Sequence, residues 1–96
     1  MTRKLSLLLV EDSEADAELL LAELRRHGFD VAVKRVDDET GLGEALADGS
    51  WEIVLCDHGL PSFSSTDALR VVRDARADIP FVVFSGTIGE EAAVEH

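Results

Sequence analysis

The stretch IVLCDHGLP at residues 53–61 leads from an apolar run into a single carboxylate, Asp57, and then into a loop. A short apolar run bounded by turn residues is typical of a strand that is buried on both faces of a sheet. The stretch LLLVEDS at residues 7–13 and the stretch FVVFSG at residues 81–86 have the same form. We therefore predict three buried strands, each followed at once by polar side chains.

Segments with helical periodicity separate these strands. Ser13 and either Asp37 or Asp38 are the expected N-caps of the first two helices, and Gly28 and Gly49 are their expected ends. The expected strands are residues 5–10, 31–36, 53–56 and 81–84, and the expected helices are residues 14–27, from 38 or 39 to 48, about 67–76 and from 90 onward. This alternation predicts an α/β fold, a doubly wound parallel sheet with helices on both faces.

Length and composition narrow the class of protein. The 96 residues suit one domain, and a hydrophobic content of 46% is enough for a core. A net charge of −11 argues against direct binding of nucleic acid and favours divalent cations or basic partner surfaces. No secretory signal is recognised, and no apolar run approaches the roughly 20 residues of a membrane span. With Cys56 as its single cysteine, the chain is expected to be a soluble cytoplasmic protein.

The polar residues at the strand ends are the candidate site. Carboxyl ends of parallel strands meet at one edge of a sheet, so Glu11, Asp12, Asp57 and Ser85 are expected to converge there. Two carboxylates about 5 Å apart repel each other by roughly 3 kcal/mol at an effective dielectric constant near 20. A cation would offset this repulsion, and oxygen ligands suit Mg²⁺. The simpler alternative is that these acids are solvated loop residues without a bound ion, and their spacing alone does not exclude it.

The expected metal site has four protein ligands. Asp12 and Asp57 would bind the ion directly, Glu11 would act through water or as a reserve ligand, and the Gly59 backbone carbonyl would complete the set. Asp57 is also a candidate nucleophile toward phosphorus.

Two residues at the end of the fourth strand have predicted roles in phosphoryl binding. Ser85 would donate a hydrogen bond to a phosphoryl oxygen, and Gly86 would let the phosphoryl group approach the backbone. Ser85 as a simple turn residue is an equal alternative at this point. We assign no catalytic role to His58, and the sequence indicates no partner for His27 or His96.

Three motifs together resemble the receiver domains of two-component response regulators. They are the acidic pair after the strand at residues 7–13, the phosphoacceptor strand with its proline at residues 53–61, and the fourth strand with its hydroxyl at residues 79–86. The resemblance extends along the whole chain and implies a flavodoxin-like sheet with strand order 2-1-3-4(-5). It also implies that Asp57 takes a phosphoryl group from a sensor histidine kinase or a phosphotransfer protein, with Mg²⁺ (or Mn²⁺) bound. Ser85 would then switch an output surface that a partner or an attached output domain reads.

The chain departs from the family pattern in two places. Ser65 stands where the family commonly has glycine, and no counterpart of the fifth strand with its phosphate-pairing lysine is recognised, since the lysines are Lys4 and Lys34. We therefore expect residues 1–96 to be a receiver domain that is incomplete at its C-terminus. The fourth strand would then be a bare apolar edge, open to edge pairing or strand exchange in a dimer.

Three other functions are weighed against this one. An inert receiver-like module that binds partners without phosphorylation is the main alternative, favoured by the missing lysine. A phosphohydrolase with an aspartyl nucleophile would need a second aspartate at the position of Gly59. A nucleotide- or flavin-binding domain would need a glycine-rich loop where Glu11 and Asp12 stand. The expected role is that of a signalling domain and not of an enzyme that turns over a metabolite.

Overall fold

The structure is a computed structural model that describes residues 3–60, 64–75, 78–85 and 93–95, with the side chains of 85 and 93–95 left out of the description. Its elements alternate between strand and helix until the last two. In chain order they are β1 (Arg3–Val10), α1 (Glu14–Arg26), β2 (Phe29–Val36), α2 (Glu39–Asp48), β3 (Ile53–Asp57), α3 (Ser65–Ala75), β4 (Phe81–Ser85) and β5 (Ala93–Glu95).

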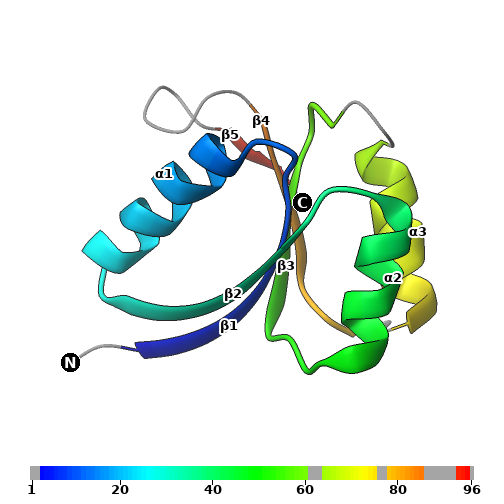
Figure 1. The fold of residues 1–96 in the computed structure, drawn as a ribbon, viewed down its shortest axis with the longest axis horizontal. Coiled ribbons are helices and arrows are strands. Elements are labelled where there is room, and N and C mark those ends of the chain that lie inside the picture. Colours follow the sequence, from blue (N-terminus) through cyan, green and yellow to red (C-terminus); the bar gives the residue numbers. More distant parts are fainter. Residues whose placement is uncertain (1–2, 61–63, 76–77, 86–92, 96) are drawn as a thin grey trace.

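The strands form one five-stranded sheet in the order β2-β1-β3-β4-β5. The first four strands are parallel, which confirms the predicted α/β class and the order 2-1-3-4. Helix α1 covers one face of this sheet, and α2 and α3 cover the other (Figure 1). Within the described ranges no helix is long and apolar enough to cross a bilayer.

The last strand corrects two expectations. Residues 93–95 form β5 in place of the predicted helix, and residues 90–92 lie outside the described residues. Strand β5 runs antiparallel to β4, with Phe84 opposite Val94 and Ser85 opposite Ala93. The predicted bare edge at β4 is therefore covered along Val83–Ser85, and edge pairing or strand exchange in a dimer stays a prediction. Along these three residues, β5 supplies partners to backbone groups that the edge would otherwise expose.

Strand β1 is buried on both faces, as its apolar run predicts. Its last four residues are fully buried, and they alternate between the two cores. Leu8 and Val10 pack with α2 and α3, while Leu7 and Leu9 pack with Ala17 of α1 and its neighbours. Two cores that share one central strand fix the position of the strand's end, where the acidic pair stands.

The helix ends follow the predicted capping signals. The Ser13 side chain accepts a hydrogen bond from the Asp16 amide at 3.2 Å, and the Asp38 side chain accepts one from the Gly41 amide at 2.6 Å. Gly28 follows α1 with a φ of 93°, a conformation that glycine adopts without strain. Helix α3 begins earlier than predicted because Ser64 caps it, accepting from the Asp67 amide at 3.1 Å.

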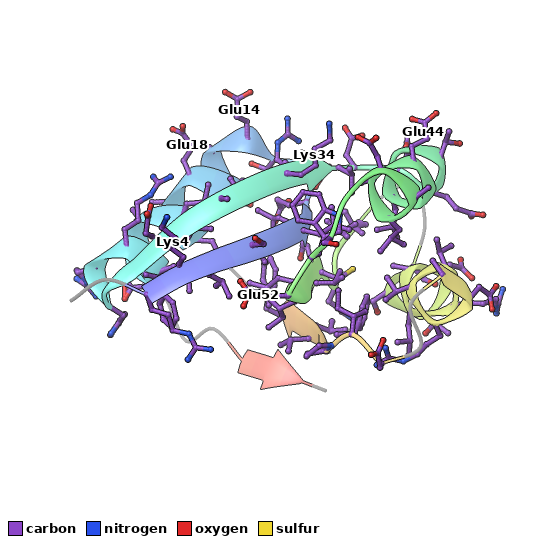
Figure 2. All side chains as sticks on the ribbon, turned by 90° about the horizontal axis from the view of Figure 1, so that it is seen from below. Lys4, Glu14, Glu18, Lys34, Glu44 and Glu52 are labelled. Carbon is purple, nitrogen blue, oxygen red and sulfur yellow. The ribbon has the colours of Figure 1, made fainter. Side chains whose placement is uncertain are left out.

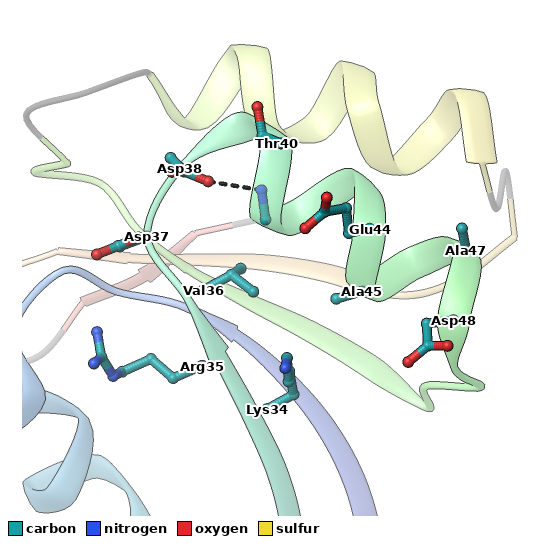
Figure 3. Close-up of a pocket in the computed structure, with 11 residues that line it drawn as sticks. Lys34, Arg35, Val36, Asp37, Asp38, Thr40, Glu44, Ala45, Ala47 and Asp48 are labelled. Carbon is teal, nitrogen blue, oxygen red and sulfur yellow. Dashed lines mark hydrogen bonds between the residues drawn. The ribbon is translucent and has the colours of Figure 1, made fainter.

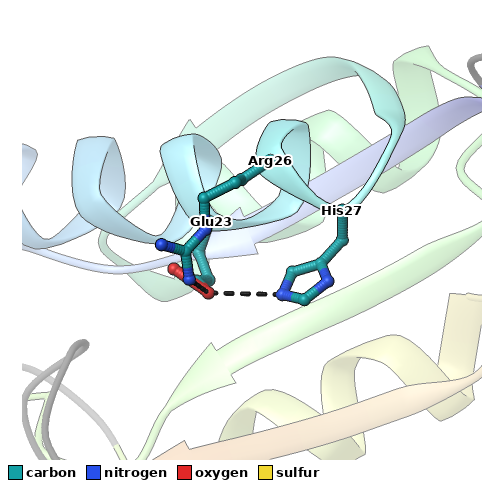
Figure 4. A network of polar contacts seen from close by, with 3 residues as sticks. All are labelled: Glu23, Arg26 and His27. Carbon is teal, nitrogen blue, oxygen red and sulfur yellow. Dashed lines mark hydrogen bonds and ion pairs between the residues drawn. The ribbon is translucent and has the colours of Figure 1, made fainter.

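One contact at the end of α1 was missing from the sequence prediction. The His27 ring lies 3.3 Å from the Glu23 carboxylate, which also pairs with Arg26 at 2.6 Å (Figure 4). Arg26 is the main cause of a lowered pKa at Glu23. Because these side chains are exposed, the cluster stabilises the helix end only slightly.

Candidate metal centre

Three carboxylates converge at the carboxyl edge of the sheet. Glu11 and Asp12 follow β1, and Asp57 ends β3, whose residue Cys56 is paired with Val10. One ligand oxygen from each carboxylate lies within 4.8 Å of the others. This is the convergence that the sequence predicts, and it is the only group of three such ligands among the described residues.

Glu11 is held in the interior while its neighbours face outward. Its exposed fraction is 1%, whereas Asp57 is half-buried and Asp12 is exposed. The Glu11 carboxylate accepts a hydrogen bond from the Ser13 amide at 3.0 Å. Burial is the main reason that the pKa of Glu11 is raised to about 7, and the nearby acids Asp12 and Asp57 raise it further. A cation bound at this site would therefore favour the ionised form of Glu11.

The loop after β3 holds Asp57 in place. The Gly59 amide donates a hydrogen bond to the Asp57 Oδ1 atom at 3.1 Å. His58, which lies between Asp57 and Gly59, donates a hydrogen bond from its backbone amide to the Phe84 carbonyl at 2.8 Å, and this bond ties the loop to β4. The two oxygens of Asp57 are thus distinguished, since Oδ1 accepts from the backbone.

The carboxylate group has the chemistry of a site for a hard divalent cation. Adjacent oxygens around Mg²⁺ are about 3 Å apart and opposite ones about 4.2 Å, given metal–oxygen distances of 2.0–2.1 Å. The limit of 4.8 Å among the three oxygens exceeds both spacings, so the carboxylates would have to close around an ion to bind it. The three oxygen donors fit Mg²⁺ better than a metal that prefers sulfur or nitrogen.

Other predicted site residues are placed less completely. Ser85 is the last residue of β4, one position after Phe84, which is paired with Asp57. This register brings its backbone to the same edge, but its side chain is outside the description. Gly59 lies in the exposed loop beside Asp57, and its carbonyl stays a predicted ligand. Gly86 lies outside the described residues.

Sequence reasoning missed one cation near the site. The Arg35 guanidinium donates a hydrogen bond to the Glu11 backbone carbonyl at 3.0 Å. Neither lysine has such a position: Lys4 stands near the start of β1, and Lys34 is paired with Leu8, whose side chain packs on the α2 and α3 side of the sheet (Figure 2). Neither is therefore a counterpart of a phosphate-pairing lysine beside Asp57.

The buried thiol next to Asp57 is not part of the ligand set. Cys56 is fully buried, and burial, with added repulsion from Asp57 and Glu11, raises its pKa to about 12. The thiol therefore stays neutral at physiological pH and acts as a small apolar side chain.

A groove of about 770 Å³ lies between β2 and α2 (Figure 3). Its charged lining residues carry both signs and come from the end of β2, the loop after it and the outer face of α2: Lys34, Arg35, Asp37, Asp38, Glu44 and Asp48. Asp38 serves as the N-cap of α2, which accounts for one of these acids structurally. The groove does not contain any of the predicted metal ligands.

Curated relatives are transcriptional and sensory regulators. The chain is 36% identical over 85 residues to the sensory transduction protein RegX3 of Mycolicibacterium smegmatis, covering 88% of this chain and 36% of that protein. It is 32% identical over 81 residues to the cell cycle transcriptional regulator CtrA of Caulobacter vibrioides, covering 83% of this chain and 34% of that protein. The chain thus spans about a third of the length of the curated relatives it matches. No family model matches it.

Solved structures share the fold. The bacteriophytochrome response regulator AtBRR has a TM-score of 0.73 and 27% identity, over 93% of this chain and 71% of that one. The receiver domain of the sensor histidine kinase PA1611 from Pseudomonas aeruginosa has a TM-score of 0.70 and 24% identity, over 83% of this chain and 66% of that one. The PA1611 structure holds a magnesium ion coordinated in its active-site cleft.

Proposed function

Because this chain belongs to the receiver domains of two-component response regulators, we propose that it accepts a phosphoryl group on Asp57 with Mg²⁺ (or Mn²⁺) bound. The phosphodonor is a sensor histidine kinase or a phosphotransfer protein. The observation that carries this proposal is the meeting of three carboxylates within 4.8 Å at the carboxyl edge of the sheet. A cytoplasmic location and a role in signal transduction, without turnover of a metabolite, are part of the same proposal.

The ligands of the ion would be Glu11, Asp12, Asp57 and the Gly59 backbone carbonyl. The three clustered carboxylates support this set, while the Gly59 carbonyl is kept from the sequence prediction, in which it completes the oxygen ligands of the ion. When bound, the ion would neutralise the carboxylates and the oxygens of the incoming phosphoryl group.

Asp57 would supply the nucleophile. The Gly59 amide already holds Oδ1, so Oδ2 is the oxygen that we assign to attack. A bond forms between this oxygen and phosphorus, and the bond from phosphorus to the donor imidazole nitrogen breaks. That nitrogen keeps the electron pair and takes a proton, so that a neutral imidazole leaves. Later attack by water on phosphorus would return the free carboxylate and inorganic phosphate.

The residues at the end of β4 would sense the phosphoryl group. The Ser85 hydroxyl would donate a hydrogen bond to one of its oxygens, and Gly86 would leave the backbone open to its approach. Ser85 lies one residue beyond the partner of Asp57, so its movement would change the surface at the end of β4. A partner or an attached output domain would read that change.

The direct test uses a small phosphodonor. The chain is incubated with acetyl phosphate and Mg²⁺, and its intact mass is measured. We expect one phosphoryl adduct, which is lost in Asp57→Asn and without Mg²⁺. Asp30→Asn is the matched control, because Asp30 is an exposed aspartate near the start of β2. If the unmutated chain gains no adduct, phosphorylation is excluded and the inert interaction module is the better assignment.

A further inference from the structure

Both backbone polar groups of Glu11 are held by the end of β2. Its amide donates to the Val36 carbonyl at 2.9 Å, which continues the pairing of β1 with β2 by one residue. Its carbonyl accepts from the Arg35 Nη1 atom at 3.0 Å. The first acidic residue of the candidate metal centre is thus fixed by two consecutive residues of a neighbouring strand.

The register explains how Arg35 reaches this carbonyl. Arg35 is paired with Leu9, whose side chain packs on the α1 side of the sheet. Cross-strand neighbours point to the same face, so the Arg35 side chain lies on the α1 side and extends toward the end of β1. Figure 3 shows the Arg35 side chain directed toward α1.

We propose that Arg35 is a positioning residue for the metal centre, acting through the backbone of Glu11. This inference rests on the proposed function, because it assigns Arg35 a part in Mg²⁺ binding. Glu11 and Asp12 are adjacent, so a change in the Glu11 peptide plane reorients both of their side chains. A guanidinium offers several donors in a rigid planar fork, which suits an anchor that holds a carbonyl.

The sign of the effect separates positioning from simple electrostatics. A positive charge near the site repels Mg²⁺, so removing the charge by itself would tighten binding slightly, with salt screening the effect. Removing an anchor would instead weaken binding, and loss of an outer-shell partner weakens metal binding by about 10- to 100-fold. Arg35→Gln therefore gives opposite results under the two explanations.

The experiment measures the Kd of Mg²⁺ by isothermal titration calorimetry in Arg35→Gln, Arg35→Lys and Lys34→Gln. Lys34→Gln is the matched control, since it removes the same charge from the adjacent residue. We expect Arg35→Gln to weaken binding about tenfold, Arg35→Lys to recover part of the loss, and Lys34→Gln to bind as well as the unmutated chain or slightly better. Mg²⁺ binding by Arg35→Gln that equals or exceeds that of the unmutated chain would overturn the proposal.

A second readout needs no metal. Hydrogen exchange by NMR in the presence of a chelator reports on the Glu11 amide and on the Ser13 amide, which donates to the Glu11 side chain. Both should exchange faster in Arg35→Gln than in Lys34→Gln. If the unmutated chain binds no Mg²⁺, the proposed metal site fails, and the exchange rates alone then decide whether Arg35 positions Glu11. Unchanged rates would refute that role.

Discussion

The edge formed by β1 and β3 and the groove between β2 and α2 are both rich in acids, yet they differ in how those acids are placed. At the edge, three carboxylates lie within 4.8 Å of one another, and Glu11 is almost fully buried. In the groove, the carboxylates of Asp38, Glu44 and Asp48 are exposed, and that of Asp38 is occupied as a helix cap. Among the described residues, only the carboxylates at the edge lie close enough together to share one ion. Convergence and burial of like charges, more than volume, indicate a site.

The largest effect expected from this difference is a pH dependence of stability. The pKa of Glu11 is about 7 in the folded chain, against an ordinary value of 4.5, and burial is the main cause. The folded state therefore binds more protons than the unfolded state between these values, so stability is lost as pH rises through this window. The Glu11 contribution at low pH amounts to about 3 kcal/mol, which is absent above pH 8.

Urea unfolding of the metal-free chain between pH 4.5 and pH 8 measures this contribution. Glu11→Gln should remove this pH-dependent contribution, so that the free energy of unfolding of the variant increases relative to that of the unmutated chain as pH rises. Glu44→Gln, the same change at an exposed residue of the groove, should follow the unmutated chain. Parallel pH curves for Glu11→Gln and Glu44→Gln would show that the two regions do not differ in this way.

A smaller effect is expected when Mg²⁺ is added. At 100 times its Kd, a ligand that binds only the folded state stabilises it by about 2.7 kcal/mol. Asp12→Asn removes a proposed ligand, and a tenfold loss of affinity would reduce the gain at the same concentration to about 1.4 kcal/mol. Asp48→Asn, in the groove, should keep the full gain. Thermal or urea unfolding with and without Mg²⁺ checks this, and an equal loss in both variants would point to nonspecific screening by the cation.

Much of this architecture could be predicted from the sequence, for an identifiable reason. Apolar runs fix where β1, β3 and β4 end, and parallel pairing brings those ends together, so the positions of Glu11 and Asp57 follow from pattern alone. The burial of Glu11 does not follow, because most carboxylates are exposed and the sequence pattern does not predict which residues would cover this side chain.

Two further features depend on tertiary contacts that leave no trace in the local sequence. Arg35 binds a backbone carbonyl 24 residues away, and every residue offers such a carbonyl. Residues 93–95 were predicted as helix, but pairing with the open side of β4 decides their conformation. In both cases the partner is a backbone group, and a backbone group has no residue-specific signal.

The smallest expected effect concerns Asp38 and shows what an acid does when it is not part of a cluster. Asp38→Ala leaves the Gly41 amide without its acceptor at 2.6 Å, and loss of an N-cap costs about 1 kcal/mol of unfolding free energy. Asp38→Ser restores an acceptor and should recover most of that loss. The Kd of Mg²⁺ should stay unchanged in both variants, because Asp38 belongs to the groove. Weaker Mg²⁺ binding in Asp38→Ser as well as in Asp38→Ala would mean that the charge of Asp38 contributes to the metal centre, and the separation between the two regions would then fail.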